Sequence, residues 1–542
     1  MSHVRNILFI MADQLRWDCL SCYGSKLIST PNIDRLAQQG VRFDRAYCQS
    51  PICGPSRMSF YTGRYSQSHG ATWNGIPLRV GEKTLGEYLR PHGLETWLVG
   101  KTHFYPDLAG MQELGVAPDS PVGKRLSECG FEVFDRMEGL YPEGPAGRYN
   151  PERSAYERYL NAQGYPGPNP WNDWANSAED ESGELLEGWY MQHAHRPARV
   201  REEHSETAYT TDRAIELLRQ HGERPWCLHL SYIKPHWPYL APAPYHNLFR
   251  ELELPPPVRS EKERKNPHPI HEAFMHSQVG QTFSREEVRR NVFPTYLGLV
   301  KQLDDHLGRL FSFMEERQLW ENTLIAFTAD HGDYLGDHWL GEKDWFHEPS
   351  VRIPLILCDP TTSDATRGTA CQTPVEAIDL IPTFLQALGA PVPEHRLEGQ
   401  SLLPVLQGAG SATLKGVAVS EYDYSVAPIA SALQADPRAA RLYMLTDERW
   451  KLIHAVGHRP VLFDLHNDPL ELSDLGEDPG HVHIRAELQD RLFEWSLRHS
   501  QRVTRSPEEL VSRRGRSLQL GIRIGYWEEG EWEATGGASE TD

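Results

Sequence analysis

The sequence predicts an α/β protein built on a mixed, mostly parallel sheet sandwiched by helices, with a smaller C-terminal α+β subdomain that carries an antiparallel sheet. As far as residue 388, apolar strand-like runs alternate with amphipathic helix-like segments. Such alternation predicts βαβ units and therefore parallel strands. From about residue 415 the pattern changes to short apolar runs separated by turns, which is typical of an antiparallel sheet.

The expected elements follow from the spacing of the apolar residues in each segment. We expect strands at residues 6–12, 96–99, 226–233, 323–328 and 354–358, and helices at residues 32–39, 207–220, 295–315 and 377–388. In the C-terminal part we expect strands at residues 442–446, 450–455 and 461–464, and a helix near residues 483–499.

Two stretches interrupt this alternation. Residues 105–201 are rich in Gly, Pro, Trp and charge, and residues 245–290 include three consecutive prolines. Long loops in compact proteins often form lids or pocket walls, so we expect both stretches to be surface excursions beside a pocket. We divide the chain into an α/β domain at 1–414, a small antiparallel-sheet subdomain with a helix at 415–500, and a C-terminal arm at 501–542.

The C-terminal arm predicts self-association. It carries Ile522, Ile524, Tyr526 and Trp527, which have no obvious core of their own to enter. Exposed apolar side chains of this kind mark subunit contacts. We therefore expect a homo-oligomer, either a dimer or a tetramer.

Composition narrows the classes of function. The chain has 542 residues, with 55 Lys and Arg against 75 Asp and Glu, and a formal net charge of −20. Non-specific nucleic-acid binding needs a basic face, so we expect no nucleic-acid partner. No stretch approaches the ~20 consecutive apolar residues of a membrane span, and the N-terminus has no signal-peptide pattern. Because the eight cysteines are mostly widely spaced, we expect a cytoplasmic protein with reduced thiols and no membrane partner.

Polar side chains directly follow four of the expected strands. In a parallel sheet the carboxyl ends of the strands share one edge, where ligands bind. Carboxylate and amide oxygens together with imidazole suit a divalent cation such as Ca²⁺, Mg²⁺ or Mn²⁺, which would neutralise and polarise an anionic ester. The residues are Asp13 and Gln14, Lys101 and His103, His236, and Asp330 and His331.

A fifth element, Cys53-Gly54-Pro55-Ser56-Arg57, predicts a nucleophile at the start of a helix. Pro55 fits the first helical turn, where its missing N–H costs nothing. Cys53 then stands at the helix N-terminus, where the dipole favours an anion, and Arg57 is placed to hold an oxyanion or a bound anion. Taken alone, each residue has an ordinary structural explanation, because a buried cysteine is usually a small hydrophobe and a histidine after a strand is usually structural.

In combination, these motifs resemble those of the sulfatases, a family of the alkaline phosphatase superfamily whose signature is Cys-x-Pro-Ser-Arg. The resemblance covers roughly residues 5–475 and is close to the arylsulfatase and phosphonate monoester hydrolase group. It implies an alkaline phosphatase-like fold. Gln14 departs from the second Asp of many sulfatases, and His331 departs from the Asn common in arylsulfatases. The other matching motifs lie at residues 6–14, 30–37, 61–64, 100–103, 235–238, 304–308, 328–338, 343, 352–354, 379–383 and 463–465.

The resemblance implies a metal- and formylglycine-dependent hydrolase of small anionic esters. Cys53 would be oxidised to formylglycine by a formylglycine-generating enzyme during maturation. One hydroxyl of the hydrated aldehyde would attack the ester, and the second would let the covalent intermediate collapse. The metal ligands would be Asp13, Gln14, Cys53, Asp330 and His331, holding Ca²⁺ or Mn²⁺. Arg57, Lys101 and His103 would support the nucleophile, His236 and Lys343 would contact the ester and its leaving oxygen, and Asn74 would contact substrate.

Three functions fit these residues. The first is an arylsulfatase-like sulfuric ester hydrolase, the second a phosphonate monoester hydrolase or phosphodiesterase, and the third a non-catalytic protein that binds anionic esters. The Asp-Gln and Asp-His pairs and Asn74 favour the phosphonate hydrolases, whereas Lys101 and His103 favour the sulfatases. We expect a sulfatase with additional activity on phosphonate monoesters and phosphodiesters, because these substrates share charge and shape. The third function is disfavoured because no proposed catalytic position is replaced.

Overall fold

The computed structural model describes residues 4–139, 154–498, 503–514 and 516. The chain forms two compact units, one of Met1–Val392 with Leu397–Arg498 and one of Pro393–Arg396 with His499–Asp542. The described residues of the second unit include a short helix, α18 (Pro507–Val511). The apolar part of the expected arm, residues 518–527, lies outside the described residues, so the subunit contact stays a prediction.

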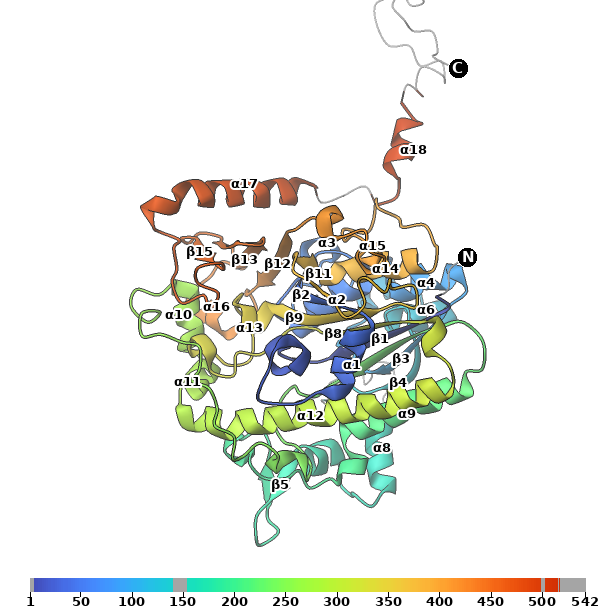
Figure 1. Ribbon diagram of the computed structural model, residues 1–542, viewed down its shortest axis with the longest axis vertical. Coiled ribbons are helices and arrows are strands. Elements are labelled where there is room, and N and C mark those ends of the chain that lie inside the picture. The colour runs from blue at the N-terminus through green and yellow to red at the C-terminus, as the bar shows by residue number, and fades with distance from the viewer. Residues whose placement is uncertain (1–3, 140–153, 499–502, 515, 517–542) are drawn as a thin grey trace, which may run out of the picture. The chain divides into compact units, whose positions relative to one another are not determined.

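Among the described residues, nine strands form the central sheet of the first unit (Figure 1). They are β1 (Asn6–Ala12), β2 (Val41–Tyr47), β3 (Glu95–Gly100), β4 (Glu132–Arg136), β7 (Trp226–Tyr232), β8 (Thr323–Ala329), β9 (Arg352–Cys358), β10 (Ala370–Cys371) and β11 (Val375–Glu376). The order is β10-β2-β9-β8-β1-β7-β3-β4, with β11 also paired to β2. Only β9 runs antiparallel to its described neighbours, β2 and β8. The mixed, mostly parallel sheet is thus confirmed.

The central strands were visible in the sequence because they are buried on both faces. Every residue of β1, β7 and β8 is buried. A parallel strand covered on both sides needs an almost continuous apolar run, and these strands have one. β2 was not predicted, because charged residues alternate with apolar ones along it and only part of it is buried.

Helices cover both faces of the sheet (Figure 1). On one side lie α1 (Pro31–Gln39), α9 (Glu206–Gln220) and α12 (Glu286–Glu316), and on the other lie α2 (Cys53–Thr62), α4 (Leu85–Leu89) and α14 (Leu380–Ala387). Helix α12 begins well before the expected residue 295, because the helix continues through Pro294 at the cost of a backbone hydrogen bond.

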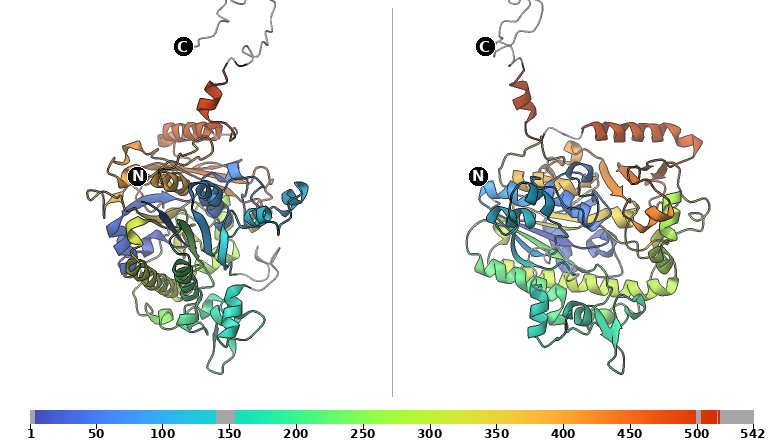
Figure 2. Two further views of the ribbon diagram at one scale, coloured as in Figure 1. Left: turned by 90° about the vertical axis from the view of Figure 1, so that its right-hand side faces the viewer. Right: turned by 180° about the vertical axis from the view of Figure 1, so that it is seen from behind.

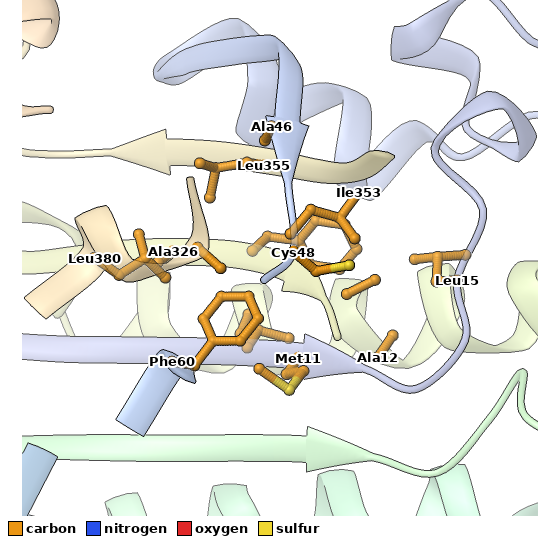
Figure 3. Packing of buried hydrophobic residues seen from close by; sticks show 14 of the residues in the cluster. Met11, Ala12, Leu15, Ala46, Cys48, Phe60, Ala326, Ile353, Leu355 and Leu380 are labelled. Atoms are coloured by element: carbon orange, nitrogen blue, oxygen red, sulfur yellow. The ribbon is translucent and has the colours of Figure 1, made fainter. Parts of the chain in front are cut away.

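The core beneath α2 fixes the start of that helix against the sheet. Figure 3 shows Met11 and Ala12 of β1, Ile353 and Leu355 of β9, and Phe60 of α2 gathered in one apolar cluster. All ten residues of α2 are buried, as expected for a helix enclosed by core rather than facing solvent.

Residues 105–201 are more than a surface excursion. β4 lies within them and pairs in parallel with β3 at the edge of the main sheet. A separate apolar cluster forms around Tyr156, Leu160 and Trp171. Strand β4 was not recognised in the sequence because it contains charged residues. One of them, Asp135, is nevertheless buried, and Tyr209 donates a hydrogen bond to its carboxylate. The stretch also holds α5 (Leu108–Glu113), α6 (Pro121–Ser127), α8 (Ala155–Ala162), β5 (Ser177–Glu179) and β6 (Leu185–Glu187).

The second excursion, residues 245–290, contains α10 (Pro269–Met275), α11 (Gln278–Phe283) and the first turn of α12. Each of the two short helices begins after a residue whose side chain accepts a backbone N–H: His268 for α10 and Ser277 for α11. Such caps satisfy N–H groups that lack partners within the helix, so this stretch is ordered despite its many polar residues.

The C-terminal part carries the expected antiparallel sheet. Its strands are β12 (Ala418–Asp423), β13 (Arg441–Thr446), β14 (Trp450–Ala455) and β15 (Val461–Asp464), in sequence order. Helix α17 (Val482–Arg498) packs on this sheet through Leu488 and Leu492 (Figure 2). β12 was not predicted, because four of its six residues are the run Ser-Glu-Tyr-Asp. The proposed domain boundaries at 414/415 and 500/501 stay predictions.

Two chain-wide features complete the fold. All eight cysteines are free thiols. None of the helices in the described part of the chain combines the length and apolar character that crossing a membrane requires.

Candidate active site

The site lies where four neighbouring parallel strands end. β8, β1, β7 and β3 are adjacent in the sheet and point the same way. Their carboxyl ends therefore meet at one edge, as expected for ligand binding in such sheets. Asp330 and His331 follow β8, Asp13 and Gln14 follow β1, His236 comes shortly after β7, and Lys101 and His103 follow β3.

The Cys53 sulfur occupies the centre of this edge. It stands at the first residue of α2 and is fully buried. His331 Nε2 and Lys343 Nζ each lie 3.0 Å from Sγ, and Asp13 Oδ1 lies 3.7 Å away. Burial opposes ionisation, but Lys343, His331 and Lys101 outweigh it and hold the pKa of the Cys53 thiol well below its usual range. The surroundings therefore stabilise a negative charge at this position.

Two buried cations hold the two buried carboxylates. Lys101 Nζ lies 2.5 Å from Asp13 Oδ2, and Arg57 Nε donates to Asp330 Oδ2 at 2.8 Å. Burial and Cys53 act to raise the pKa of Asp13, but Lys101 and His236 lead the opposing contributions that hold it well below its usual range. The Asp13 carboxylate is thus kept ionised.

Arg57 does not face the cavity, contrary to the expectation that it holds a bound anion. Besides Asp330, its guanidinium donates to the Lys101 carbonyl at 2.9 Å and to Ser231 Oγ at 2.8 Å. Asp13 is also within 3.4 Å. A buried carboxylate needs a paired cation, and Arg57 meets that need from beneath the site. Arg57 thus reaches the site through Asp330 and Asp13 and not from the cavity wall.

Gln14 supplies an unsatisfied oxygen. Its side-chain Nε2 donates to Asp333 Oδ2 at 2.6 Å and to Tyr239 OH at 3.1 Å, while the buried Oε1 has no hydrogen-bond partner among the described residues. Leaving a buried acceptor unpaired is costly. The two donor contacts orient the amide, so Oε1 is the atom left for a ligand.

The residues fit one divalent cation. Asp13, Cys53, Asp330 and His331 each offer a ligand atom, and these atoms lie within 4.8 Å of one another. His331 Nδ1 lies 2.9 Å from the Gly332 carbonyl, which fixes the ring and leaves Nε2 facing the cluster, as is typical of metal-bound histidine. Together with Gln14 Oε1, the donor set is three oxygen-bearing groups, one imidazole and residue 53.

The remaining predicted residues line one cavity with Cys53. His236 Nδ1 lies 2.7 Å from the Trp237 carbonyl, which leaves Nε2 available. Asn74 Oδ1 accepts the Gly54 N–H at 2.8 Å, so its amide nitrogen is the free donor. Gly54 is needed for this approach, because a Cβ there would lie 2.7 Å from Asn74 Oδ1.

The cavity has a volume of about 470 Å³ and broad aromatic walls. As expected, both excursions contribute: Trp171 and Trp189 come from the first, and Phe274 from the second. The C-terminal subdomain adds residues 427–429. The other lining side chains used below are Trp73, Asn74, Lys101, His103, Glu138, His236, Trp237, Glu342, Lys343 and Asp344.

The sequence analysis missed three residues that shape the site. Asp333 and Tyr239 orient Gln14, and Tyr239 donates to Asp333 at 2.6 Å. Glu138 accepts the backbone N–H groups of Thr102 and His103. Asp333 stood within the Asp330–Asp333 motif and could have been singled out there. Glu138 becomes visible only once β4 is recognised as a strand, because it lies two residues beyond that strand's end.

Comparison with known proteins places this geometry in a family. The family model described as sulfatase matches residues 5–390. The chain belongs to the sulfatase family. A second model, the C-terminal region of N-sulphoglucosamine sulphohydrolase, matches residues 336–498 of this sulfatase.

Two related sequences and one solved structure show which enzymes the chain is similar to. The sulfatase is 30% identical over 536 residues to the multifunctional alkaline phosphatase superfamily protein PehA of Trinickia caryophylli, covering 94% of this chain and 99% of that protein. It is 28% identical to a choline-sulfatase of Rhizobium meliloti, covering 88% and 83% of the two chains. Its structure matches the phosphonate monoester hydrolase SpPMH from Silicibacter pomeroyi with a TM-score of 0.79 and 28% identity, covering 92% and 96%.

Family and relatives together indicate a sulfuric ester hydrolase of the alkaline phosphatase superfamily. The alternative of a non-catalytic binder finds no support among these relatives. The fold alone would not settle chemistry, but here the site residues and the family agree.

Proposed function

We propose that this sulfatase hydrolyses aryl and small alkyl sulfates with the help of one divalent cation and a formylglycine at residue 53, and that it also accepts phosphonate monoesters and phosphodiesters. The observation that carries the proposal is the buried cationic surround of Cys53, in which Lys343 Nζ and His331 Nε2 each lie 3.0 Å from Sγ. A monoanionic tetrahedral ester complements such a centre better than a neutral ester does.

The protein's own side chains orient the nucleophile and the ester. Lys101 and Arg57 hold Asp13 and Asp330 in place, and Lys343 donates toward the position where charge develops on the leaving oxygen. When formed, formylglycine hydrate supplies a nucleophilic hydroxyl and a second hydroxyl that releases the bound group. When bound, the cation withdraws charge from the ester oxygens.

Manganese and calcium are the cations we favour at this site. Carboxylate and amide oxygens suit both ions, while the imidazole of His331 favours Mn²⁺.

Phosphonate monoester or phosphodiester hydrolysis is the second candidate as the main activity. Two observations favour it: Gln14 stands where many sulfatases have a carboxylate, and the Asn74 amide nitrogen is available to the cavity. The structural match to SpPMH adds to them. The two candidates differ in the ester they prefer, not in the machinery.

A matched set of chromogenic esters tests the proposal. We would measure kcat/KM for p-nitrophenyl sulfate, a p-nitrophenyl phosphonate monoester, a p-nitrophenyl phosphodiester and p-nitrophenyl phosphate, using protein made in a host that forms formylglycine. We expect the sulfate to rank first and the dianionic phosphate last. A higher kcat/KM for the phosphonate would support the second candidate, and no turnover of any ester would refute both.

The seven cysteines other than Cys53 are unpaired, which supports a reducing, cytoplasmic location. We also propose that the protein is a homo-oligomer that is matured by a formylglycine-generating enzyme. Removing residues 503–542 is then expected to lower the molar mass measured by light scattering to that of a smaller assembly.

A further inference from the structure

Two acidic side chains flank Lys343 in the wall of the cavity. Glu342 and Asp344 both line it, as Lys343 does. Lys343 itself is directed at the nucleophile, because its Nζ lies 3.0 Å from Cys53 Sγ and 3.5 Å from His331 Nε2. Lys343 also acts on both carboxylates, so within the described residues they share a cation that contacts the nucleophile as well.

The backbone at both positions is strained. Glu342 has φ 57° and Asp344 has φ 95°, in the left-handed region that side chains other than glycine rarely adopt. Such conformations cost free energy and cluster at functional sites. Both strained residues line the cavity, and they flank Lys343 in the sequence.

Two groups of aromatic rings line the same cavity as these carboxylates. The first aromatic wall is the row of Trp171, Trp189 and Trp237, with ring centroids 6.2 and 5.1 Å apart. The second wall is Trp73 and Phe274, whose rings lie 5.8 and 6.0 Å from that of Tyr422.

A hydrogen bond connects the second wall to Asp344 through Tyr422. Tyr422, behind the second wall, donates a hydrogen bond to Asp344 Oδ1 at 3.1 Å. Burial raises the pKa of Glu342 to about 7, with Lys343 and the Trp237 side chain acting against that rise. Burial likewise raises the pKa of Asp344. In both cases burial is the largest cause of the rise, and Lys343 is the largest contribution against it.

We propose that this aromatic and acidic part of the cavity is a cation subsite, which binds an amine or quaternary ammonium group on the alcohol half of the ester. The inference rests on the proposed function, since it assigns the leaving half of that same substrate. The substrate is then a zwitterion: its anionic ester faces Lys101, Lys343 and the metal ligands, and its cation faces Glu342, Asp344 and the indole rings.

The chemistry of the walls selects this class over a neutral aryl alcohol. Indole faces attract ammonium groups, and the attraction grows when the cation is desolvated. A neutral aromatic alcohol would fill the same volume but would leave two carboxylates against apolar surface. An ammonium group satisfies the rings and the carboxylates together.

A pair of non-hydrolysable sulfonates isolates the positive charge. The first is trimethylammoniopropane sulfonate, and the second is dimethylpentane sulfonate, its isostere with carbon in place of nitrogen. Both carry the same anion and nearly the same shape. Binding is measured by tryptophan fluorescence, which needs no turnover, and as competitive inhibition of p-nitrophenyl sulfate hydrolysis.

We expect the ammonium sulfonate to bind about tenfold or more tightly than its isostere. The double variant Glu342→Gln, Asp344→Asn should bring this ratio close to one. The matched control Glu184→Gln removes an exposed carboxylate of the first excursion that does not line the cavity, and it should keep the ratio of the unaltered protein.

Equal or tighter binding of the carbon isostere would overturn the cation subsite, and so would a ratio that survives the double variant. Aryl sulfate hydrolysis without a charge preference would leave the proposed function standing and remove this inference alone. Charge-selective binding without hydrolysis of any ester would support the cation subsite and refute the proposed function.

Discussion

Glu138 fixes the backbone of His103: its Oε2 accepts the His103 N–H at 2.8 Å. Its Oε1 accepts both the N–H and the hydroxyl of Thr102, at 3.1 and 2.8 Å. His103 has φ 53°, a conformation that a non-glycine residue holds only when its surroundings enforce it. The direction of the His103 ring is thus set by a residue just beyond β4, far away in the sequence.

Glu138→Gln should weaken turnover through His103 rather than through substrate binding. The amide keeps the shape but loses the charge that pairs with Arg136 at 2.8 Å and places a donor where two acceptor oxygens are needed. We expect kcat to fall about 10-fold to 100-fold with a smaller change in KM, and the pH profile of kcat to shift. Glu132→Gln, in β4 but outside the cavity lining, should leave both unchanged. A loss confined to thermal stability would show that Glu138 is only structural.

Replacing the nucleophile separates modification from folding. Cys53→Ser keeps a hydroxyl near the position of Sγ, while Cys53→Ala removes it. Both should fold, because residue 53 lies in a fully buried helix held by its other residues, and both should lose about 10³-fold or more in kcat/KM.

The mass of the peptide containing residue 53 provides the matching measurement. Unaltered protein from a competent host should show the thiol replaced by an aldehyde. An intact thiol in fully active protein would contradict the formylglycine assignment.

Lys101→Ala should impair sulfate-ester hydrolysis strongly. The lysine lies 2.5 Å from Asp13 Oδ2 and contributes to the low pKa of the Cys53 thiol. Its removal leaves a buried carboxylate with one cation fewer, so we expect kcat/KM for p-nitrophenyl sulfate to fall about 100-fold or more. Lys262→Ala, an exposed lysine of the second excursion, is the control. Unchanged turnover in Lys101→Ala would remove the main reason for preferring sulfates over phosphonates.

The sequence was informative where a residue's role depends on its own strand. Asp13 and Asp330 follow buried apolar runs, so their place at one sheet edge could be derived from the rule for parallel strands. Cys53 at the start of α2 followed from Pro55 in the first turn.

The sequence was uninformative where a role depends on distant pairing. β4 carries too many charges to resemble a strand, and with it Glu138 was lost. Arg57 was expected to hold a bound anion. The sequence near Arg57 gives no sign that its Nε lies 2.8 Å from Asp330 Oδ2. Glu342 and Asp344, on either side of Lys343, have left-handed backbone conformations that no local sequence pattern indicates.

Removing the metal should affect stability as well as activity. A chelator is expected to abolish turnover and to lower the melting temperature, because a ligand that binds only the folded protein stabilises it. The proposed ligands Asp13, Asp330 and His331 come from two different strand ends, so a cation bound between them would join these parts of the folded chain. Adding back Mn²⁺ and Ca²⁺ separately, with calorimetry as the readout, identifies the preferred ion. Full activity after exhaustive chelation would contradict the metal assignment.

The pH dependence of stability should reveal a carboxyl group outside the active site. Glu421 of β12 is buried, and burial raises its pKa from 4.5 to about 8, against the lowering effect of the Gln67 N–H that it accepts. The folded protein therefore binds the proton more tightly than the unfolded chain does. The stability that this group contributes is complete below about pH 4.5 and is lost as the pH rises to about 8.

Glu421→Gln mimics the protonated form at every pH. We expect its melting temperature to match that of the unaltered protein near pH 5 and to exceed it above about pH 8. The corresponding gain in the free energy of unfolding is on the order of a few kcal/mol. Glu448→Gln, an exposed position in the turn between β13 and β14, serves as the control and should follow the unaltered curve. Parallel curves for Glu421→Gln and the unaltered protein across this range would show that Glu421 is already ionised in the fold.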